Sequence, residues 1–207
     1  MLRITHIEFR RRKPERFIVH FDEDEIHTFS PETALKYGFV LEREFSDEEF
    51  LEILKEDSIR RAKDQALRYL EIRPHSKKEL TLKLLRKSYP KEVIETALYD
   101  LKKVDLVNDE TFTQQFIQNE LNLRPGSKRL LRSKLIQRGI KSEIFEPILD
   151  KFYEKQDETE IALQIAKKFL KTQRDTKKDK QKEKLVRHLL NKGFDWEIID
   201  WVVKEKL

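Results

Sequence analysis

The sequence predicts a mainly α-helical protein, built from tandem repeats of three-helix units in an elongated, curved array. A small N-terminal antiparallel β-meander and a short helix precede the array. Three observations lead to this fold class. Alternating apolar residues, which are typical of strands, occur only near the N-terminus. A pattern of helical apolar residues then returns about every 50 residues. Charged residues make up 40% of the 207 residues and only 4 residues are glycine, which favours thin helical layers over a thick α/β core.

The N-terminal segment, residues 1–56, contains all of the strand patterns. Residues 16–22 alternate between apolar and polar side chains, which predicts a strand. Residues 25–29 are predicted to form a second strand that runs back after a polar turn, and residues 3–11 a third that completes the meander. Ser30 followed by proline is typical of the start of a helix, and Gly38 is typical of its end.

A second helix is predicted to begin at Ser46, because serine followed three residues later by Glu49 forms a capping box. This helix either breaks near Asp57 or continues, and the sequence leaves both possibilities open.

The rest of the chain divides into three predicted repeats, residues 57–107, 108–156 and 157–207. Each repeat reads as three helices joined by short turns. The second helix of each repeat carries equivalent apolar residues, which are Leu80, Leu84 and Leu85, then Leu131, Leu135 and Ile136, then Leu185, Leu189 and Leu190. In the last helix we expect Trp201 to close the terminal core. A three-helix unit of this size buries little surface alone, so neighbouring units are expected to stack.

Charge is distributed unevenly along the chain. The net charge is +5 overall, but residues 1–56 carry −5 and residues 57–207 carry +10. The densest basic segment, residues 167–192, holds 11 basic and 3 acidic residues. Such asymmetry indicates a polyanionic or acidic partner for the basic part. The alternative is a pair of helices whose charges are simply solvated.

No pattern typical of catalysis or metal binding emerges. The 5 histidines lack the helical spacing of a zinc site, and the chain has no cysteine. We therefore expect no enzymatic activity, no cofactor and no metal. No stretch approaches the ~20 apolar residues that span a bilayer, so no membrane partner is expected. The N-terminus has no apolar signal core, which indicates a cytoplasmic protein.

Three segments of the repeats carry a family resemblance. The first joins an Ala-Leu-x-x-Leu helix at residues 66–70 to the pattern Arg73-x-x-Ser76-x-x-Glu79-Leu80. The others are Leu-x-x-Asp-x-x-Phe at residues 106–112 and the segment 126–140, which ends in Arg-Gly-Ile. In this combination and order, the chain resembles the RecX family of regulatory proteins, which modulate RecA recombinase. Residues 1–56 resemble the β-hairpin extension of its longer members. One departure is Ser88-Tyr89, where a glycine is common in the family.

The resemblance implies a negative regulator of RecA recombinase that controls DNA repair and recombination. Such proteins bind along the RecA–single-stranded DNA filament and inhibit its extension, its ATPase activity and strand exchange. The implied partners are thus the RecA filament and single-stranded DNA, with duplex DNA as a weaker ligand. We further expect a monomer.

Contact is expected to be distributed over a basic face. The candidate residues are Arg73, Lys77 and Lys78 in the first repeat, Arg124, Lys128, Arg129 and Arg132 in the second, and Lys167, Lys168, Lys171, Arg174, Lys177 and Lys178 in the third. For Arg73, a role in helix capping or a structural ion pair stands beside a role in contact.

Two other functions remain open at this stage. Three-helix units resemble helix-turn-helix modules, so direct DNA binding is one alternative. The predicted third helices begin with acidic or apolar residues, however, such as Glu92, Glu143 and Trp196, which argues against base recognition in the major groove. A purely structural helical scaffold is the other alternative.

Overall fold

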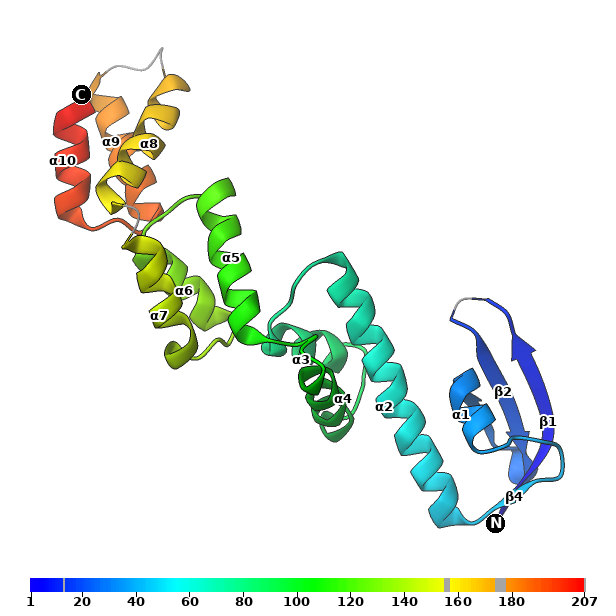
Figure 1. The fold of residues 1–207 in the computed structure, drawn as a ribbon. Coiled ribbons are helices and arrows are strands. Elements are labelled where there is room, and N and C mark those ends of the chain that lie inside the picture. Colours follow the sequence, from blue (N-terminus) through cyan, green and yellow to red (C-terminus); the bar gives the residue numbers. More distant parts are fainter. Residues whose placement is uncertain (13, 155–156, 174–177, 207) are drawn as a thin grey trace. The chain divides into compact units, whose positions relative to one another are not determined.

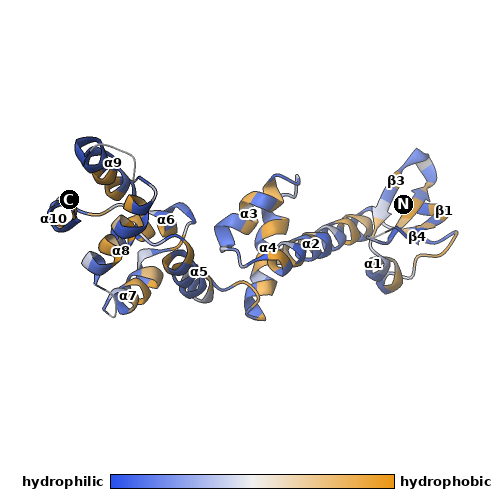
Figure 2. Ribbon diagram, turned by 90° about the horizontal axis from the view of Figure 1, so that it is seen from above, coloured by the Kyte–Doolittle hydropathy of each residue, from blue (hydrophilic) through white to orange (hydrophobic). Residues whose placement is uncertain are grey.

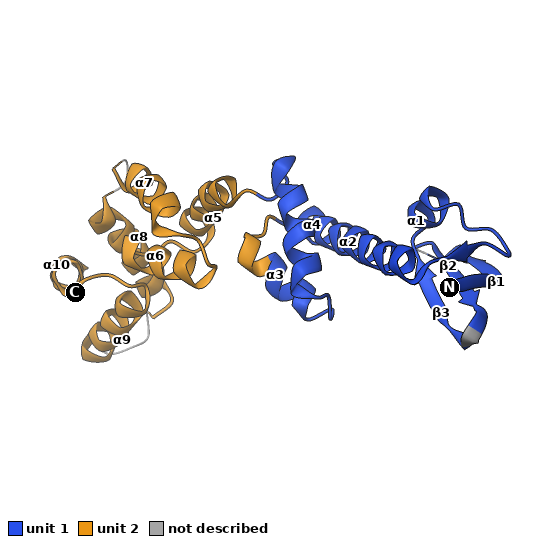
Figure 3. Cartoon of the chain, turned by 90° about the horizontal axis from the view of Figure 1, so that it is seen from below, with its two compact units in different colours: residues 1–73, 80–107 blue, residues 74–79, 108–207 orange. Residues whose placement is uncertain are grey.

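The computed structural model describes residues 1–12, 14–154, 157–173 and 178–206. It confirms the predicted fold class, because the described chain is mainly helical and its strands lie near the N-terminus (Figure 1). The chain forms two compact units, shown in different colours in Figure 3. The first comprises Met1–Arg73 and Leu80–Val107, and the second comprises Pro74–Glu79 and Asn108–Leu207.

The sheet has one strand more than predicted. Strands β1 (Leu2–Arg10), β2 (Arg16–Phe21) and β3 (Ile26–Phe29) form the expected antiparallel meander, with the short 3₁₀ helix η1 (Asp22–Asp24) between β2 and β3. The additional strand β4 (Glu44–Phe45) pairs with β1, which gives the order β3-β2-β1-β4. Two residues are too few for an alternating pattern to be recognised in a sequence.

Helices α1 (Pro31–Lys36) and α2 (Asp47–Ile72) pack beside this sheet. The predicted caps are present, since the Ser30 and Ser46 side chains each accept a bond from a backbone N–H three residues later. Helix α2 continues through Asp57, whose buried carboxylate accepts a hydrogen bond from the Ser30 N–H at 2.8 Å and forms an ion pair with Arg61 at 2.9 Å. This carboxylate therefore joins α2 to the start of α1.

The remaining helices form three groups in the described part of the chain. The first group contains the later turns of α2 with α3 (Lys77–Leu85) and α4 (Lys91–Lys103), the second contains α5 (Asp109–Leu123), α6 (Lys128–Gln137) and α7 (Ser142–Tyr153), and the third contains α8 (Glu158–Lys171), α9 (Lys178–Asn191) and α10 (Trp196–Lys206). Figure 2 shows apolar and polar residues interleaved along these helices, as expected for helices that bury one face.

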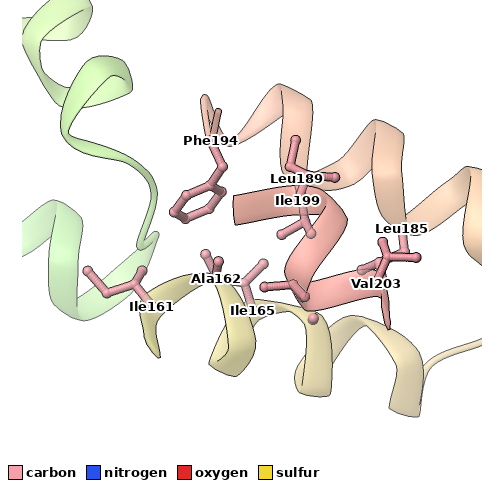
Figure 4. Close-up of a cluster of buried hydrophobic side chains, with 10 residues drawn as sticks. Ile161, Ala162, Ile165, Leu185, Leu189, Phe194, Ile199 and Val203 are labelled. Carbon is pink, nitrogen blue, oxygen red and sulfur yellow. The ribbon is translucent and has the colours of Figure 1, made fainter. Parts of the chain in front are cut away.

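Each group has its own apolar core, which contains the first two predicted apolar residues of α3, α6 and α9. The third residue of each set is less buried, since Leu85 is half-buried and Ile136 and Leu190 are exposed. In the third group, Leu185 and Leu189 of α9 meet Ile161 and Ile165 of α8 and Ile199 of α10 (Figure 4). One expectation was wrong, since the side chain of Trp201 is 47% exposed. The core of the third group is closed by Val202 and Val203 of the same helix.

The turn after the second helix has the same hydrogen bonds in all three groups. Ser88, Gly139 and Gly193 occupy the left-handed region with φ of 62°, 76° and 83°. The N–H of the next residue bonds in each case to the carbonyl of the buried leucine five positions earlier, at 3.1–3.3 Å. This is the Schellman geometry, in which glycine is the favoured residue. Ser88 departs from that preference and is exposed.

Candidate binding surface

The start of α3 lies against the turn between α6 and α7, inside the second unit. Ser76 caps α3 by accepting a bond from the Glu79 N–H at 3.2 Å, and its hydroxyl donates to the Arg138 carbonyl at 2.7 Å. The turn residue Gly139 packs on Lys78 so closely that an added Cβ would lie 2.7 Å from the lysine Cβ.

The start of α6 lies in the same way against the turn between α9 and α10. The Ser127 side chain caps α6 through the Leu130 N–H at 3.1 Å, and the Ser127 N–H donates to the Lys192 carbonyl at 2.9 Å. An added Cβ at Gly193 would lie 2.5 Å from Ser127 Oγ and 2.9 Å from Leu130 Cβ. The close approach explains why glycine stands at this turn and at Gly139.

These contacts engage several of the predicted basic residues. Lys78 donates to the Gln137 carbonyl at 3.2 Å. Arg129 donates to the Gly193 carbonyl at 3.1 Å and pairs with Asp195 at 3.3 Å. Both side chains therefore bond to the turn that the start of their own helix contacts.

Two more candidates of the second group are paired with carboxylates. Lys128 forms an ion pair with Asp150 at 2.5 Å. Arg132 donates two hydrogen bonds to Glu146, at 2.6 and 2.8 Å, and these bonds raise the pKa of the guanidinium above its usual value. Bidentate pairs of this kind position both side chains. The positive charges of the α6 helix are thus largely neutralised inside the group.

The other candidates of the first two groups lie at helix ends. Arg73 ends α2, with its N–H bonded to the Tyr69 carbonyl. The Lys77 N–H donates to Asp109 at 2.9 Å. Arg124 follows α5 and its side chain is exposed.

The third group differs, because four of its candidate lysines are exposed and form no ion pair among the described residues. Lys167, Lys168 and Lys171 lie on the last turns of α8, and Lys178 begins α9. Within residues 157–173 and 178–206, none of these four forms an ion pair. Of the remaining candidates, Arg174 and Lys177 lie outside the described residues.

The structure adds two lysines that sequence reasoning missed. Lys180 and Lys182, on the first turns of α9, are also exposed and form no ion pair among the described residues. Their signal in the sequence was the same basic run that contains Lys178. We define the α8–α9 lysine surface as Lys167, Lys168, Lys171, Lys178, Lys180 and Lys182. These residues belong to the last turns of α8 and the first turns of α9, two helices that pack together, and in Figure 1 those two helix ends lie at the same end of the third group.

A histidine lies further along α9 from this surface. His188 stacks on Phe169 of α8, with ring centroids 4.5 Å apart and planes at 17°. Burial, together with the charge of Lys192, lowers the pKa of His188 below its usual value. His188 is therefore an uncharged packing residue near neutral pH.

The described residues offer little for chemistry at a single centre. Among them, no three or more histidine or acidic side chains are placed to hold a metal ion together. A hollow of about 790 Å³ lies between α5 and α7 and is lined by Gln114, Gln118, Ile144, Pro147, Ile148 and Phe152, among others. None of the described helices is both long and apolar enough to cross a membrane.

Comparison with known proteins now places these features in a family. Residues 62–101 match the model of the first three-helix domain of RecX, and residues 156–203 match that of the third. The chain is 31% identical over 210 residues to "Regulatory protein RecX" of Clostridium botulinum strain Alaska E43, an alignment that covers 100% of this chain and 97% of that protein. The protein of the same name from Clostridium acetobutylicum is 32% identical, with 98% and 95% covered. The chain belongs to the RecX family.

Solved RecX structures share the fold. The structure titled "Crystal structure of regulatory protein RecX" superposes with a TM-score of 0.68 at 20% identity and covers 98% of both chains. RecX from Lactobacillus salivarius superposes with a TM-score of 0.58 at 25% identity, and covers 72% of this chain and 96% of that one. The three-helix groups are thus the RecX three-helix domains.

Proposed function

We propose that this chain regulates RecA recombinase by binding the RecA–single-stranded DNA filament, and that the α8–α9 lysine surface makes the main contact with its negative charges. In this proposal the protein acts by binding, without a catalytic step of its own, in the cytoplasm. It limits filament extension and thereby lowers ATP hydrolysis and strand exchange.

One observation carries the choice of surface. In the second group, three predicted contact residues are paired with Asp150, Asp195 and Glu146, and a partner would have to break those pairs. The lysines of the α8–α9 lysine surface form no ion pair among the described residues, so the three donors of each remain available to a partner. The free-energy cost of taking such a lysine out of water is compensated when it meets a phosphate or a carboxylate. Binding to phosphate also releases the counterions of the nucleic acid, which makes the affinity depend on salt.

The test measures the DNA-dependent ATPase activity of RecA against increasing concentrations of this protein. The variant carries Lys167→Glu, Lys168→Glu and Lys171→Glu. When the logarithm of the filament-binding constant is plotted against the logarithm of the salt concentration, each lost contact with a single-strand phosphate should reduce the steepness of the slope by about 0.7. The loss of three contacts should therefore reduce it by about 2. We expect at least about tenfold weaker inhibition at physiological salt, which corresponds to about 1.4 kcal/mol.

The matched control makes the same change of charge elsewhere. Lys55, Lys91 and Lys102 are exposed and form no ion pair among the described residues, so their triple change to glutamate should leave inhibition nearly unaltered. Circular dichroism checks that both variants remain helical. Equal inhibition by the two triple variants would exclude the α8–α9 lysine surface. Tighter binding to bare duplex DNA than to the filament would exclude the proposed function itself.

A further inference from the structure

The N-terminal sheet carries an apolar groove that the proposed function does not use. It has a volume of about 480 Å³ and lies between the open ends of β1 and β2, the helix α1 and the segment after it. Its main lining residues are Phe9, Phe17, Ala34, Leu35, Phe39 and Val40.

The groove is both exposed and anchored. The side chains of Leu35, Val40 and Phe9 are 84%, 60% and 42% exposed, although all three are large and apolar. Phe39 fixes the floor, because its ring contacts the buried rings of Phe29 and Phe45 at centroid distances of 4.9 and 5.5 Å. A contiguous apolar patch on an anchored base is typical of a protein interaction site.

The charges beside the groove are positive, although residues 1–56 carry a net −5. Arg11 and Arg12 lie two and three residues after Phe9, are exposed, and form no ion pair within the described residues. In the sheet, Arg10 lies directly opposite Arg16 and pairs with Glu8 at 3.5 Å. The charges of Arg11 and Arg12 are therefore the ones available to a partner at this end of the hairpin.

We propose that this groove binds a short segment of a partner protein, whose apolar side chains enter the groove and whose acidic side chains meet Arg11 and Arg12. The positive charges of Arg11 and Arg12 favour acidic residues in the partner segment. The apolar lining, which includes Phe9 and Leu35, favours an aromatic or aliphatic residue.

Two other occupants fit the groove less well. Its lining residues are apolar, and a nucleic acid strand would need phosphate contacts along its length, which none of these lining residues supplies. A second copy bound through the same face would bring the arginines of the two chains together, because a two-fold interface matches a patch with itself.

The test uses the full chain and a random-peptide phage library. We expect enrichment of sequences that combine an aromatic or aliphatic residue with aspartate or glutamate. Synthetic peptides of the enriched sequences, labelled with fluorescein, should bind at least about tenfold more weakly to the Leu35→Asp variant. Leu51→Asp is the matched control, because Leu51 is 65% exposed on α2 outside the groove, and it should bind normally.

The arginines are tested separately. The double variant Arg11→Glu and Arg12→Glu should weaken binding about tenfold, whereas the same change at Lys55 should not. No enrichment, enrichment of basic peptides, or equal binding to the Leu35→Asp variant would overturn the proposal. So would binding of labelled oligo(dT) that is lost in that variant, or a dimer in sedimentation that the variant dissociates.

Discussion

Replacing Gly193 by alanine tests how tightly the turn between α9 and α10 is held against the start of α6. The new Cβ meets two costs. At φ of 83° an L-residue other than glycine costs about 1–2 kcal/mol. The Cβ would also lie 2.5 Å from Ser127 Oγ and 2.9 Å from Leu130 Cβ, and overpacking of this kind typically costs about 1–3 kcal/mol. We therefore expect a loss of about 2–5 kcal/mol in the free energy of unfolding of this region.

Tryptophan fluorescence during urea unfolding is a selective assay, because both tryptophans of the chain, Trp196 and Trp201, lie on α10. With a slope near 2 kcal/mol per molar urea, the midpoint should fall by about 1–2.5 M. Ser88→Gly isolates the backbone contribution, since Ser88 has the same turn geometry but is exposed. Followed by circular dichroism, that variant should be more stable by up to about 1 kcal/mol. A Gly193→Ala midpoint within about 0.3 M of the parent would refute the tight contact.

Three further perturbations follow from the described contacts. Because burial lowers the pKa of His188 below its unfolded value near 6.5, the unfolded chain binds the proton more readily, so the third group should lose stability as the pH falls below about 6.5. His188→Asn should flatten that decline in tryptophan-monitored urea unfolding, and an equally steep decline would contradict the assignment. Asp57→Asn should cost about 1–3 kcal/mol in thermal unfolding of the first unit, because Arg61 loses its charged partner but is 35% exposed, so water compensates part of the loss; a cost below about 0.5 kcal/mol would show that the pair is unimportant. A double-mutant cycle with Arg132→Ala and Glu146→Ala should give a coupling of about 0.5–1 kcal/mol in urea unfolding, and additive effects would mean that the bidentate pair contributes nothing.

The helical groups could be predicted because burial imposes a period on the sequence. Two leucines recur at helical spacing in each of α3, α6 and α9, from Leu80 and Leu84 onward, and these six are buried, whereas the predicted third residue of each helix is half-buried or exposed. The strand β4 could not be predicted from two residues, and it exists because β1 offers an edge to Glu44 and Phe45. Trp201 was misplaced because valines on two neighbouring positions of α10 fill the core that the larger ring was expected to close.

The candidate surface was predictable only in part. Charge density located the basic end of the third group, but it gave no information about which cations have partners. The partners of Arg129 and Arg132 lie 66 and 14 residues further along the chain, on other elements, and only the fold brings them together. The candidate cations of the second group are therefore mostly paired with carboxylates, whereas the described candidate lysines of the third group can bind a partner.

The exposed turn at Ser88 bears on self-association. A contact between the start of one helix and the turn of another group is heterologous, and heterologous contacts can continue from one molecule to the next without limit. Ser88 carries a Cβ at the position where Gly139 and Gly193 leave room for a neighbouring helix start. A single serine side chain is therefore an obstacle to a further contact of the same kind between molecules.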